Sequence, residues 1–158
     1  EELLPILEEV RTLFEDQART KRIRLEVADC ATEPKARIDR DRIIQALANL
    51  LDNALRLTPE GGRVILAVAE RDGCVELSVS DDGPGIEPEL LERLFDRFAQ
   101  SSSSGGGAGL GLAIVKGVAV AHGGEVTAGS IRSEGATFTI RLPRVASTPA
   151  GRVGQSVG

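Results

Sequence analysis

The chain has 158 residues, of which 41% are hydrophobic, and this size and composition suit a single domain with one hydrophobic core. Its formal net charge is -5 at pH 7, with basic residues scattered among acidic ones, so we do not expect nucleic acid as a partner. No apolar run approaches the roughly 20 residues that cross a bilayer, which predicts a cytoplasmic piece whose parent protein can still be anchored in a membrane. Two cysteines and one histidine give no disulfide framework and no metal-ligand spacing.

The N-terminal part of the chain predicts one helix and two short strands. Apolar residues recur at helical spacing over residues 3–14, so we expect the chain to open with an amphipathic helix. Apolar and charged residues alternate over residues 22–27, which is typical of a half-buried strand, and residues 36–38 form a further candidate strand.

A second helix is expected from a cap at Asp39 or Asp41 to about Leu57, where a Thr-Pro-Glu-Gly-Gly sequence stops it. Valine-rich and leucine-rich stretches at 64–69 and 74–80 flank an Arg-Asp-Gly turn and therefore predict an antiparallel hairpin.

The C-terminal half predicts two more helices and a second hairpin. Short helix 88–94 is followed by a Ser-Gly run at 101–107, and a longer helix is expected at about 110–121. Stretches 125–130 and 136–142 are expected to pair as the closing hairpin. We therefore predict an α+β two-layer sandwich in a domain of residues 1–143, with 144–158 as a disordered tail.

Asn49, Asn53 and Arg56 form a polar stripe on the helix expected to end at Leu57. The two asparagines are four residues apart, so their carboxamides point the same way, and Arg56 extends the stripe by nearly one turn. Amide oxygens and a cation can hold a hydrated Mg²⁺ ion and phosphate oxygens. Taken alone, the stripe is more often the solvent-facing side of an amphipathic helix.

The sequence Asp-Asp-Gly-Pro-Gly-Ile of residues 81–86 directly follows a predicted strand. A carboxylate at that place can accept a hydrogen bond from an exocyclic amine such as that of adenine, and the glycines allow close approach of a ligand. A plain Asp-Gly and Pro-Gly turn is the alternative reading. If the apolar residues of 75–79 face the core, Asp81 shares their side of the strand and Asp82 the opposite side.

A glycine cluster at 105–111 leads into the apolar helix of 110–121. Unpaired backbone N–H groups and the positive end of a helix dipole coincide there, which favours a polyphosphate. Ser-Gly runs are also common flexible linkers, but that reading explains only the first half of the cluster. The upstream serines and glycines are then expected to act as a lid over a nucleotide.

In this order and spacing, the motifs resemble those of the GHKL ATPases, and among them the histidine kinases. Residues 49–56 resemble the N-box, 81–85 the G1 box, 94–98 the F-box and 107–112 the G2 box. The resemblance covers nearly everything except the tail. It implies a mixed, mostly antiparallel sheet of about five strands packed on about three helices.

The resemblance also implies roles for individual residues. Asn53 would bind Mg²⁺ with help from Asn49, Arg56 and Arg97 would contact phosphate, and Asp81 would recognise the adenine amine. The other residues expected to bind the nucleotide are Gly83, Gly85, Ile86, Gly107, Gly109, Leu110, Gly111 and Leu112.

Asn49 bears on which member of the family this is. Relatives that hydrolyse ATP carry Glu there, and a neutral amide cannot take a proton from water, so the resemblance favours a protein-histidine kinase. Such a kinase passes the γ-phosphate to a histidine on a separate upstream dimerisation domain, and the parent forms a homodimer through that domain. Residues 1–20 can be the junction with it. A response regulator is then the partner of the parent, and the isolated domain is expected to be a monomer.

Two other readings stay open at this point. One is a degenerate GHKL module that binds a partner protein and no longer uses ATP. The other is a serine kinase of the anti-sigma-factor type, although such kinases usually carry Glu at the position of Asn49.

His122 is the only histidine of the chain. It follows the last predicted helix within a His-Gly-Gly sequence, where packing or capping at the helix end is favoured over phosphoacceptance. We therefore do not expect this domain to phosphorylate itself.

Overall fold

The computed structural model describes all residues except 29, 31, 33, 84–107, 131–134 and 145–158, and of residues 108–110 and 130 the backbone alone. Its helices and strands are α1 (Leu4–Leu13), α2 (Glu15–Lys21), β1 (Arg24–Val27), α3 (Arg40–Leu57), β2 (Arg63–Arg71), β3 (Cys74–Asp81), α5 (Ala108–Ala121), β4 (Glu125–Ser130) and β5 (Ala136–Pro143). The predicted hairpins and long helices are thus confirmed to within a few residues.

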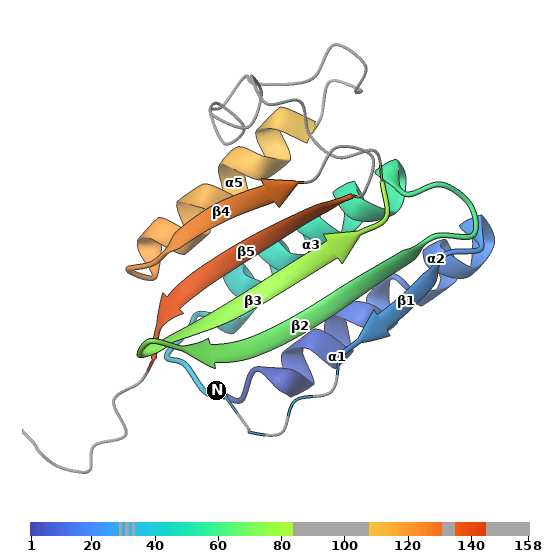
Figure 1. Cartoon of the computed structure of the whole chain (residues 1–158). Helices are drawn as coiled ribbons and strands as arrows, with labels where there is room; N and C mark the ends of the chain where they lie inside the picture. Colours follow the sequence, from blue (N-terminus) through green and yellow to red (C-terminus); the bar gives the residue numbers. More distant parts are fainter. Residues whose placement is uncertain (29, 31, 33, 84–107, 131–134, 145–158) are drawn as a thin grey trace, which may run out of the picture.

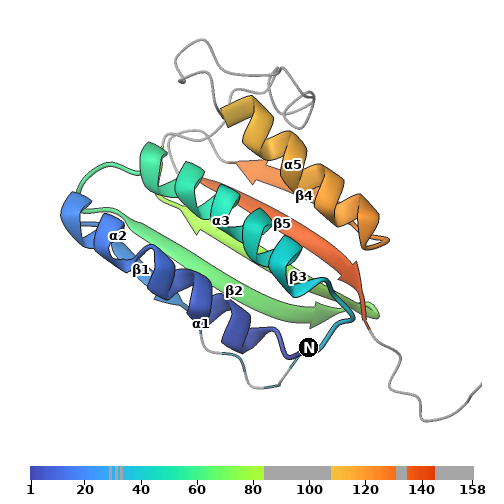
Figure 2. The same cartoon turned by 180° about the vertical axis from the view of Figure 1, so that it is seen from behind.

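The strands form one sheet in the order β1-β2-β3-β5-β4. Strand β1 is parallel to β2, and the other neighbours are antiparallel. The four described helices lie on one face of this sheet (Figures 1 and 2). The structure therefore confirms an α+β two-layer sandwich with a mixed, mostly antiparallel sheet.

The predicted opening helix over residues 3–14 is confirmed, but a second short helix that was not predicted follows it. Helix α1 ends at Leu13, and α2 starts at Glu15. At Phe14, with φ −108° and ψ 6°, the backbone N–H donates to the carbonyl of Arg11, three residues back, so the regular i to i−4 ladder is interrupted. The described part of the chain therefore has four helices, of which α2 was not predicted.

The candidate strand at residues 36–38 does not form. This stretch meets the first residues of the chain, because the N-terminal amine of Glu1 donates to the Ala36 carbonyl and Ala36 N–H donates back to Glu1. A single bridge between Glu2 and Lys35 is all that results. The segment is thus tied to the start of α1 and does not extend the sheet.

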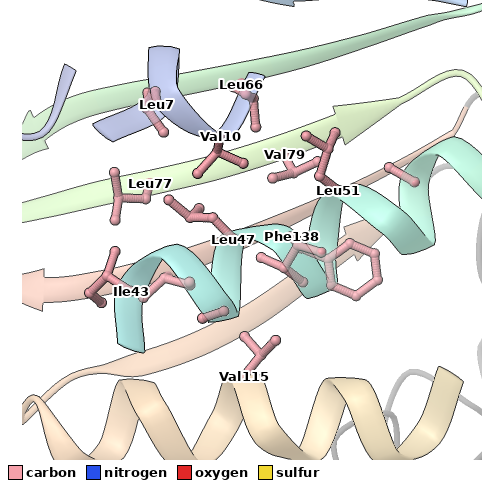
Figure 3. Close-up of a cluster of buried hydrophobic side chains, with 14 of the residues drawn as sticks. Leu7, Val10, Ile43, Leu47, Leu51, Leu66, Leu77, Val79, Val115 and Phe138 are labelled. Atoms are coloured by element: carbon pink, nitrogen blue, oxygen red, sulfur yellow. The ribbon is translucent and has the colours of Figure 1, made fainter. Parts of the chain in front are cut away.

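Alternate residues of β2, β3 and β5 face the helices and form the core. The buried strand residues are Val64, Leu66, Val68, Val75, Leu77, Val79, Ala136, Phe138, Ile140 and Leu142. Leucines and isoleucines of α1 and α3, with Val115 of α5, pack against them from the helical layer (Figure 3). This period-two burial confirms that Asp81, the last residue of β3, points to the same side.

Helix α3 has well-defined ends. The side chain of Asp39 accepts a hydrogen bond from the backbone N–H of Arg42 and so acts as the N-cap, as one of the two predicted candidates. At the other end, Thr58 is extended and Pro59 has no N–H to continue the helix. The helix therefore stops just after its polar stripe.

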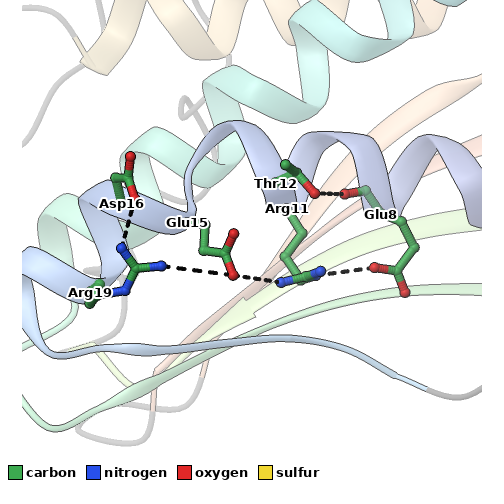
Figure 4. A network of polar contacts seen from close by, with 6 residues as sticks. All are labelled: Glu8, Arg11, Thr12, Glu15, Asp16 and Arg19. Carbon is green, nitrogen blue, oxygen red and sulfur yellow. Dashed lines mark hydrogen bonds and ion pairs between the residues drawn. The ribbon is translucent and has the colours of Figure 1, made fainter.

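The outward side of α1 and α2 carries a ladder of charged residues (Figure 4). Arg11 contacts Glu8 at 3.1 Å, and Arg19 contacts Asp16 at 2.7 Å. Because these pairs are exposed, each contributes roughly 0.5 kcal/mol or less to stability. They mark the solvent-facing side of the helical layer.

The expected helix 88–94, the Ser-Gly run 101–107 and residues 145–158 of the expected tail lie outside the described residues. Arg144, the first residue of that tail, is ordered, because its backbone N–H donates to the Gly73 carbonyl. Of the helices that are described, none combines the length and the apolar character that crossing a membrane requires.

Candidate functional site

Three segments that carry the predicted site residues meet at one end of the sheet. The C-terminal end of α3, the end of β3 and the start of α5 lie together in both views (Figures 1 and 2). A long hydrogen bond of 3.5 Å from the Asn49 side chain to the Gly111 carbonyl joins α3 to the first turns of α5. The topology thus brings together motifs that are more than 50 residues apart in the sequence.

The polar stripe of α3 is only partly a solvent-facing side. Asn53 is 6% exposed, and its side-chain oxygen accepts a hydrogen bond of 2.7 Å from the guanidinium of Arg56. Asn49 is half-buried, and Arg56 is exposed. Since buried amides are normally hydrogen-bonded, the single cation partner leaves acceptor capacity on the Asn53 oxygen.

Asp81 is a buried carboxylate, 7% exposed, at the last position of β3. Its Oδ1 accepts a hydrogen bond of 2.7 Å from the backbone N–H of Gly83. Burial raises the pKa of Asp81 above its ordinary value, the backbone N–H groups of Gly83 and Ala136 oppose that rise, and the nearby charge of Asp82 adds to it. Asp81 is therefore an acceptor held by backbone donors, and within the described part of the chain no cation pairs with it.

Asp82 points the other way, as the strand register predicts. It is exposed, and its Oδ2 accepts a hydrogen bond of 3.0 Å from the backbone N–H of Arg63. The two adjacent aspartates thus have different contacts: Asp82 accepts from the first residue of β2, and Asp81 faces the helical layer.

Gly83 has room for no side chain. A Cβ atom there would lie 2.9 Å from Oδ1 of Asp81 and 3.2 Å from the Leu57 carbonyl oxygen. The absence of a side chain lets the end of β3 lie close to the end of α3, which brings Asp81 to the same end of the sheet as the polar stripe of α3.

The start of α5 is described in part. Gly109 and Leu110 are placed in the helix by their backbone, and a Cβ atom on Gly111 would meet open space. Leu112, predicted to contact the nucleotide, has its side chain in the core at 4% exposure. Gly85, Ile86, Arg97 and Gly107, also predicted as site residues, lie outside the described residues.

Lys21 is a residue near the site that sequence reasoning missed. Its ammonium group donates to the backbone carbonyls of Leu55 and Arg56, at 2.8 and 2.9 Å. Pro59 is a signal that the end of α3 needs an outside donor, but it does not indicate which residue supplies one.

His122 lies at the opposite end of α3 from Asn53. Its Nε2 accepts a hydrogen bond of 2.9 Å from the Asp39 backbone N–H, and Nδ1 lies 2.8 Å from the Val118 carbonyl, to which it donates in the neutral tautomer. Asp39 and Asn53 are about 21 Å apart along the helix. The predicted packing role at the helix end is confirmed.

Replacing His122 with alanine is expected to lower the free energy of unfolding by about 0.5 to 1.5 kcal/mol, because it removes the hydrogen bond to the exposed Asp39 N–H, which water then replaces. Urea unfolding measures the loss. His122→Gln, which keeps a polar side chain, should lose less, and unchanged stability of the alanine variant would contradict this role.

Within the described residues, no group of three or more His, Cys, Asp or Glu side chains could hold a metal ion. The donor set instead consists of neutral amide oxygens with a neighbouring cation. It fits an ion such as Mg²⁺, which keeps most of its water ligands and is shared with substrate phosphates.

Comparison with known proteins agrees with the fold and the motifs. The sequence profile of the Histidine kinase-, DNA gyrase B-, and HSP90-like ATPase family matches residues 38–146. Sensor histidine kinase WalK of Bacillus subtilis (strain 168) is 44% identical over 112 residues, which are 67% of this chain and 18% of WalK. The chain therefore spans less than a fifth of that relative.

Solved structures give the same result. The nucleotide-free catalytic domain of histidine kinase ThkA superposes with a TM-score of 0.81 at 30% identity, covering 91% of this chain and 94% of that domain. ThkA in complex with response regulator protein TrrA matches with a TM-score of 0.74 at 29% identity, over 96% of this chain and 42% of that one. Full-length ShkA in complex with AMPPNP matches with a TM-score of 0.83 at 36% identity, over 91% of this chain and 30% of that one. The chain belongs to the histidine kinase-, DNA gyrase B- and HSP90-like ATPase family, and it is similar there to sensor histidine kinase WalK and histidine kinase ThkA.

Proposed function

We propose that this chain is the catalytic domain of a sensor histidine kinase, which binds Mg-ATP and presents the γ-phosphate to a histidine on a dimerisation domain. The observation that carries the proposal is the buried carboxylate of Asp81, next to the C-terminal end of α3, whose partners among the described residues are backbone N–H groups. A buried carboxylate without a cation costs stability, so a ligand that donates to it explains its presence. The exocyclic amine of adenine is such a donor.

The phosphate end of the nucleotide would lie towards α3 and the start of α5. Asn53 would bind Mg²⁺ with Asn49 beside it, and the metal supplies neutralisation of the charge on the phosphate oxygens. The Arg56 guanidinium donates to the Asn53 side-chain oxygen at 2.7 Å and is therefore close to the proposed metal ligand. When the Asn53 oxygen binds Mg²⁺ instead, this guanidinium would be free to donate to a phosphate oxygen. Arg97 would be a second cation for the phosphates.

Glycines would let the backbone close around the nucleotide. Support comes from Gly83, where the surroundings exclude a Cβ atom, and from Gly111, where the space beside the backbone is open. The same role is proposed for Gly85, Gly107 and Gly109, and contacts with the nucleotide are proposed for Ile86, Leu110 and Leu112. AMPPNP, bound in the ShkA structure, is an ATP analogue, which agrees with this ligand.

The phosphoacceptor would be a histidine other than His122. Both ring nitrogens of His122 are hydrogen-bonded to backbone groups, at the far end of α3 from the proposed phosphate site. In the transfer, an imidazole nitrogen of the acceptor forms the N–P bond while the bond from γ-phosphorus to its bridging oxygen breaks and ADP leaves. The domain contributes position and charge neutralisation.

The wider role in two-component signalling is part of the same proposal. The acceptor histidine would belong to the dimerisation domain through which the parent protein forms a homodimer, and a response regulator would receive the phosphoryl group. ThkA in complex with TrrA is a relative bound to such a partner. Asn49 supports transfer over hydrolysis, because its amide cannot act as a general base for water.

Calorimetric titration with ATP, in the presence and absence of Mg²⁺, tests the proposal. The wild-type domain should bind saturably, and more tightly with Mg²⁺. Asn53→Ala should weaken Mg-ATP binding by about tenfold, since it removes the proposed metal ligand, and should leave little difference between the two conditions.

Gln45→Ala is the matched control, because Gln45 is an exposed amide on α3 two turns before Asn53. It should bind Mg-ATP like the wild type. No binding by the wild-type domain at millimolar nucleotide would overturn the proposal and favour a module that binds a partner protein.

A further inference from the structure

The last turn of α3 lacks a donor that a regular helix end supplies. The carbonyl of Leu55 would normally accept from the backbone N–H four residues later, but that residue is Pro59, which has none. Thr58 still donates to the Ala54 carbonyl at 2.9 Å, and it is the last backbone N–H to do so before the chain turns away. This turn carries Asn53 and Arg56, so its order bears directly on the proposed site.

Lys21 supplies the hydrogen-bond donor that Pro59 lacks. Its Nζ atom donates to the carbonyls of Leu55 at 2.8 Å and Arg56 at 2.9 Å, across 34 and 35 residues of chain. A positive charge at a helix C-terminus also interacts favourably with the helix dipole. The two carbonyls belong to the peptide groups on either side of the Arg56 Cα, and the Arg56 side chain donates to Asn53.

The backbone on either side of Lys21 is fixed by its own hydrogen bonds. Arg22 is left-handed, with φ 62°, and its carbonyl accepts from Gly61 N–H at 3.0 Å. Arg24 N–H donates to the Gly62 carbonyl at 3.0 Å. The corner between α2 and β1 and the loop between α3 and β2 are therefore one hydrogen-bonded unit, from which Lys21 reaches the end of α3.

We propose that Lys21 is a positioning residue for nucleotide binding, which acts by holding the last turn of α3 so that Asn53 and Arg56 face metal and phosphate together. This inference rests on the proposed function. It also means that the segment before residue 38, which the family profile does not match, contributes to the site. Lys21 itself touches no ligand in this scheme.

The test compares three variants by calorimetric titration with ATP, with and without Mg²⁺. Lys21→Met, which keeps the chain length and removes the donor and charge, should weaken Mg-ATP binding by about threefold to tenfold. It should also shrink the gain in affinity that Mg²⁺ confers on the wild type. Lys21→Arg, which can still donate to both carbonyls, should restore both quantities.

Arg19→Met is the control for bulk charge, because Arg19 is an exposed cation two residues earlier on α2, paired with Asp16 at 2.7 Å. It should bind within about twofold of the wild type, since an exposed charge is largely screened. Equal weakening by Arg19→Met and Lys21→Met would overturn the positioning role. So would a Lys21→Met variant with wild-type affinity and wild-type Mg²⁺ dependence.

Thermal unfolding of each variant keeps folding separate from binding, with titrations run well below the midpoint. If Lys21→Met does not fold, Lys21→Gln, which retains a neutral donor, should show an intermediate loss of affinity, and wild-type affinity would overturn the inference. A wild-type domain that binds no Mg-ATP would overturn the proposed function and this inference with it. Normal wild-type binding with unchanged Lys21 variants would overturn this inference alone.

Discussion

Replacing Asp81 with asparagine is expected to weaken Mg-ATP binding by about thirtyfold to a hundredfold, the largest loss of affinity predicted for this domain. The substitution keeps the shape of the side chain, but it exchanges one carboxylate oxygen for an NH₂ group. The Gly83 N–H needs an acceptor, so the remaining oxygen stays with it and the NH₂ group meets the amine of adenine. Two donors then face each other, and a hydrogen bond to a charged acceptor, of about 2 to 3 kcal/mol, is lost.

Calorimetric titration measures the loss, and Asp82→Asn is the matched control. Asp82 is adjacent but exposed, and it contacts the backbone of Arg63 outside the helical layer. Its variant should bind Mg-ATP within a few-fold of the wild type. Equal losses in the two variants would mean that the general negative charge of this loop matters and that Asp81 has no specific contact.

The same substitution should change how stability depends on pH. Burial raises the pKa of Asp81 above that of an unfolded aspartate, about 3.9, so this carboxyl group binds a proton more tightly in the folded state than in the unfolded state. The stability that this group contributes is therefore fully present below pH 3.9 and is lost as pH rises through the raised pKa. In urea unfolding without nucleotide, the stability of Asp81→Asn relative to the wild type should increase from pH 4 to pH 7. A decrease would show that the ionised carboxylate stabilises the empty domain.

Replacing Gly124 with alanine is expected to lower the free energy of unfolding by about 2 to 4 kcal/mol, the largest loss of stability predicted here. A Cβ atom at Gly124 would be too close to the backbone of β5. It would overlap the Arg141 carbonyl oxygen, and it would lie 3.0 Å from the carbonyl carbon of Arg141 and 3.2 Å from the Cα of Leu142. Relief requires moving β5, which pairs with both β3 and β4. Urea unfolding with an unchanged m-value measures the loss.

Gly117→Ala is the matched control on the same helix-to-strand unit. Gly117 is exposed on α5, and a Cβ atom there meets nothing within 4 Å. Alanine should therefore stabilise the domain by about 0.5 to 1 kcal/mol through helix propensity. If both glycine variants destabilise the domain alike, the close contact at Gly124 is not the cause.

Local sequence patterns predicted the structure correctly where the residues that contact one another are close in sequence. The Asp39 cap, the end of α3 before Pro59 and the β2–β3 hairpin follow from short-range chemistry, and the structure confirms them. Period-two burial along β3 was enough to turn Asp81 inward and Asp82 outward. Two features were predicted less well: helix α2 was missed, and the strand expected at 36–38 does not form, because that stretch contacts the first residues of the chain.

The sequence by itself determined the fold class, the side of the sheet that Asp81 faces and the motifs that identify the family, because periodicity, turn chemistry and motif spacing are local properties. Only the tertiary structure decided that Asn49 reaches Gly111, that both ring nitrogens of His122 contact backbone at the far end of α3, and that Lys21 caps α3. Apart from the contact of His122 with Val118, four residues back, those contacts join residues 34 to 83 positions apart. Their geometry depends on how the helices pack on the sheet, which no local pattern encodes.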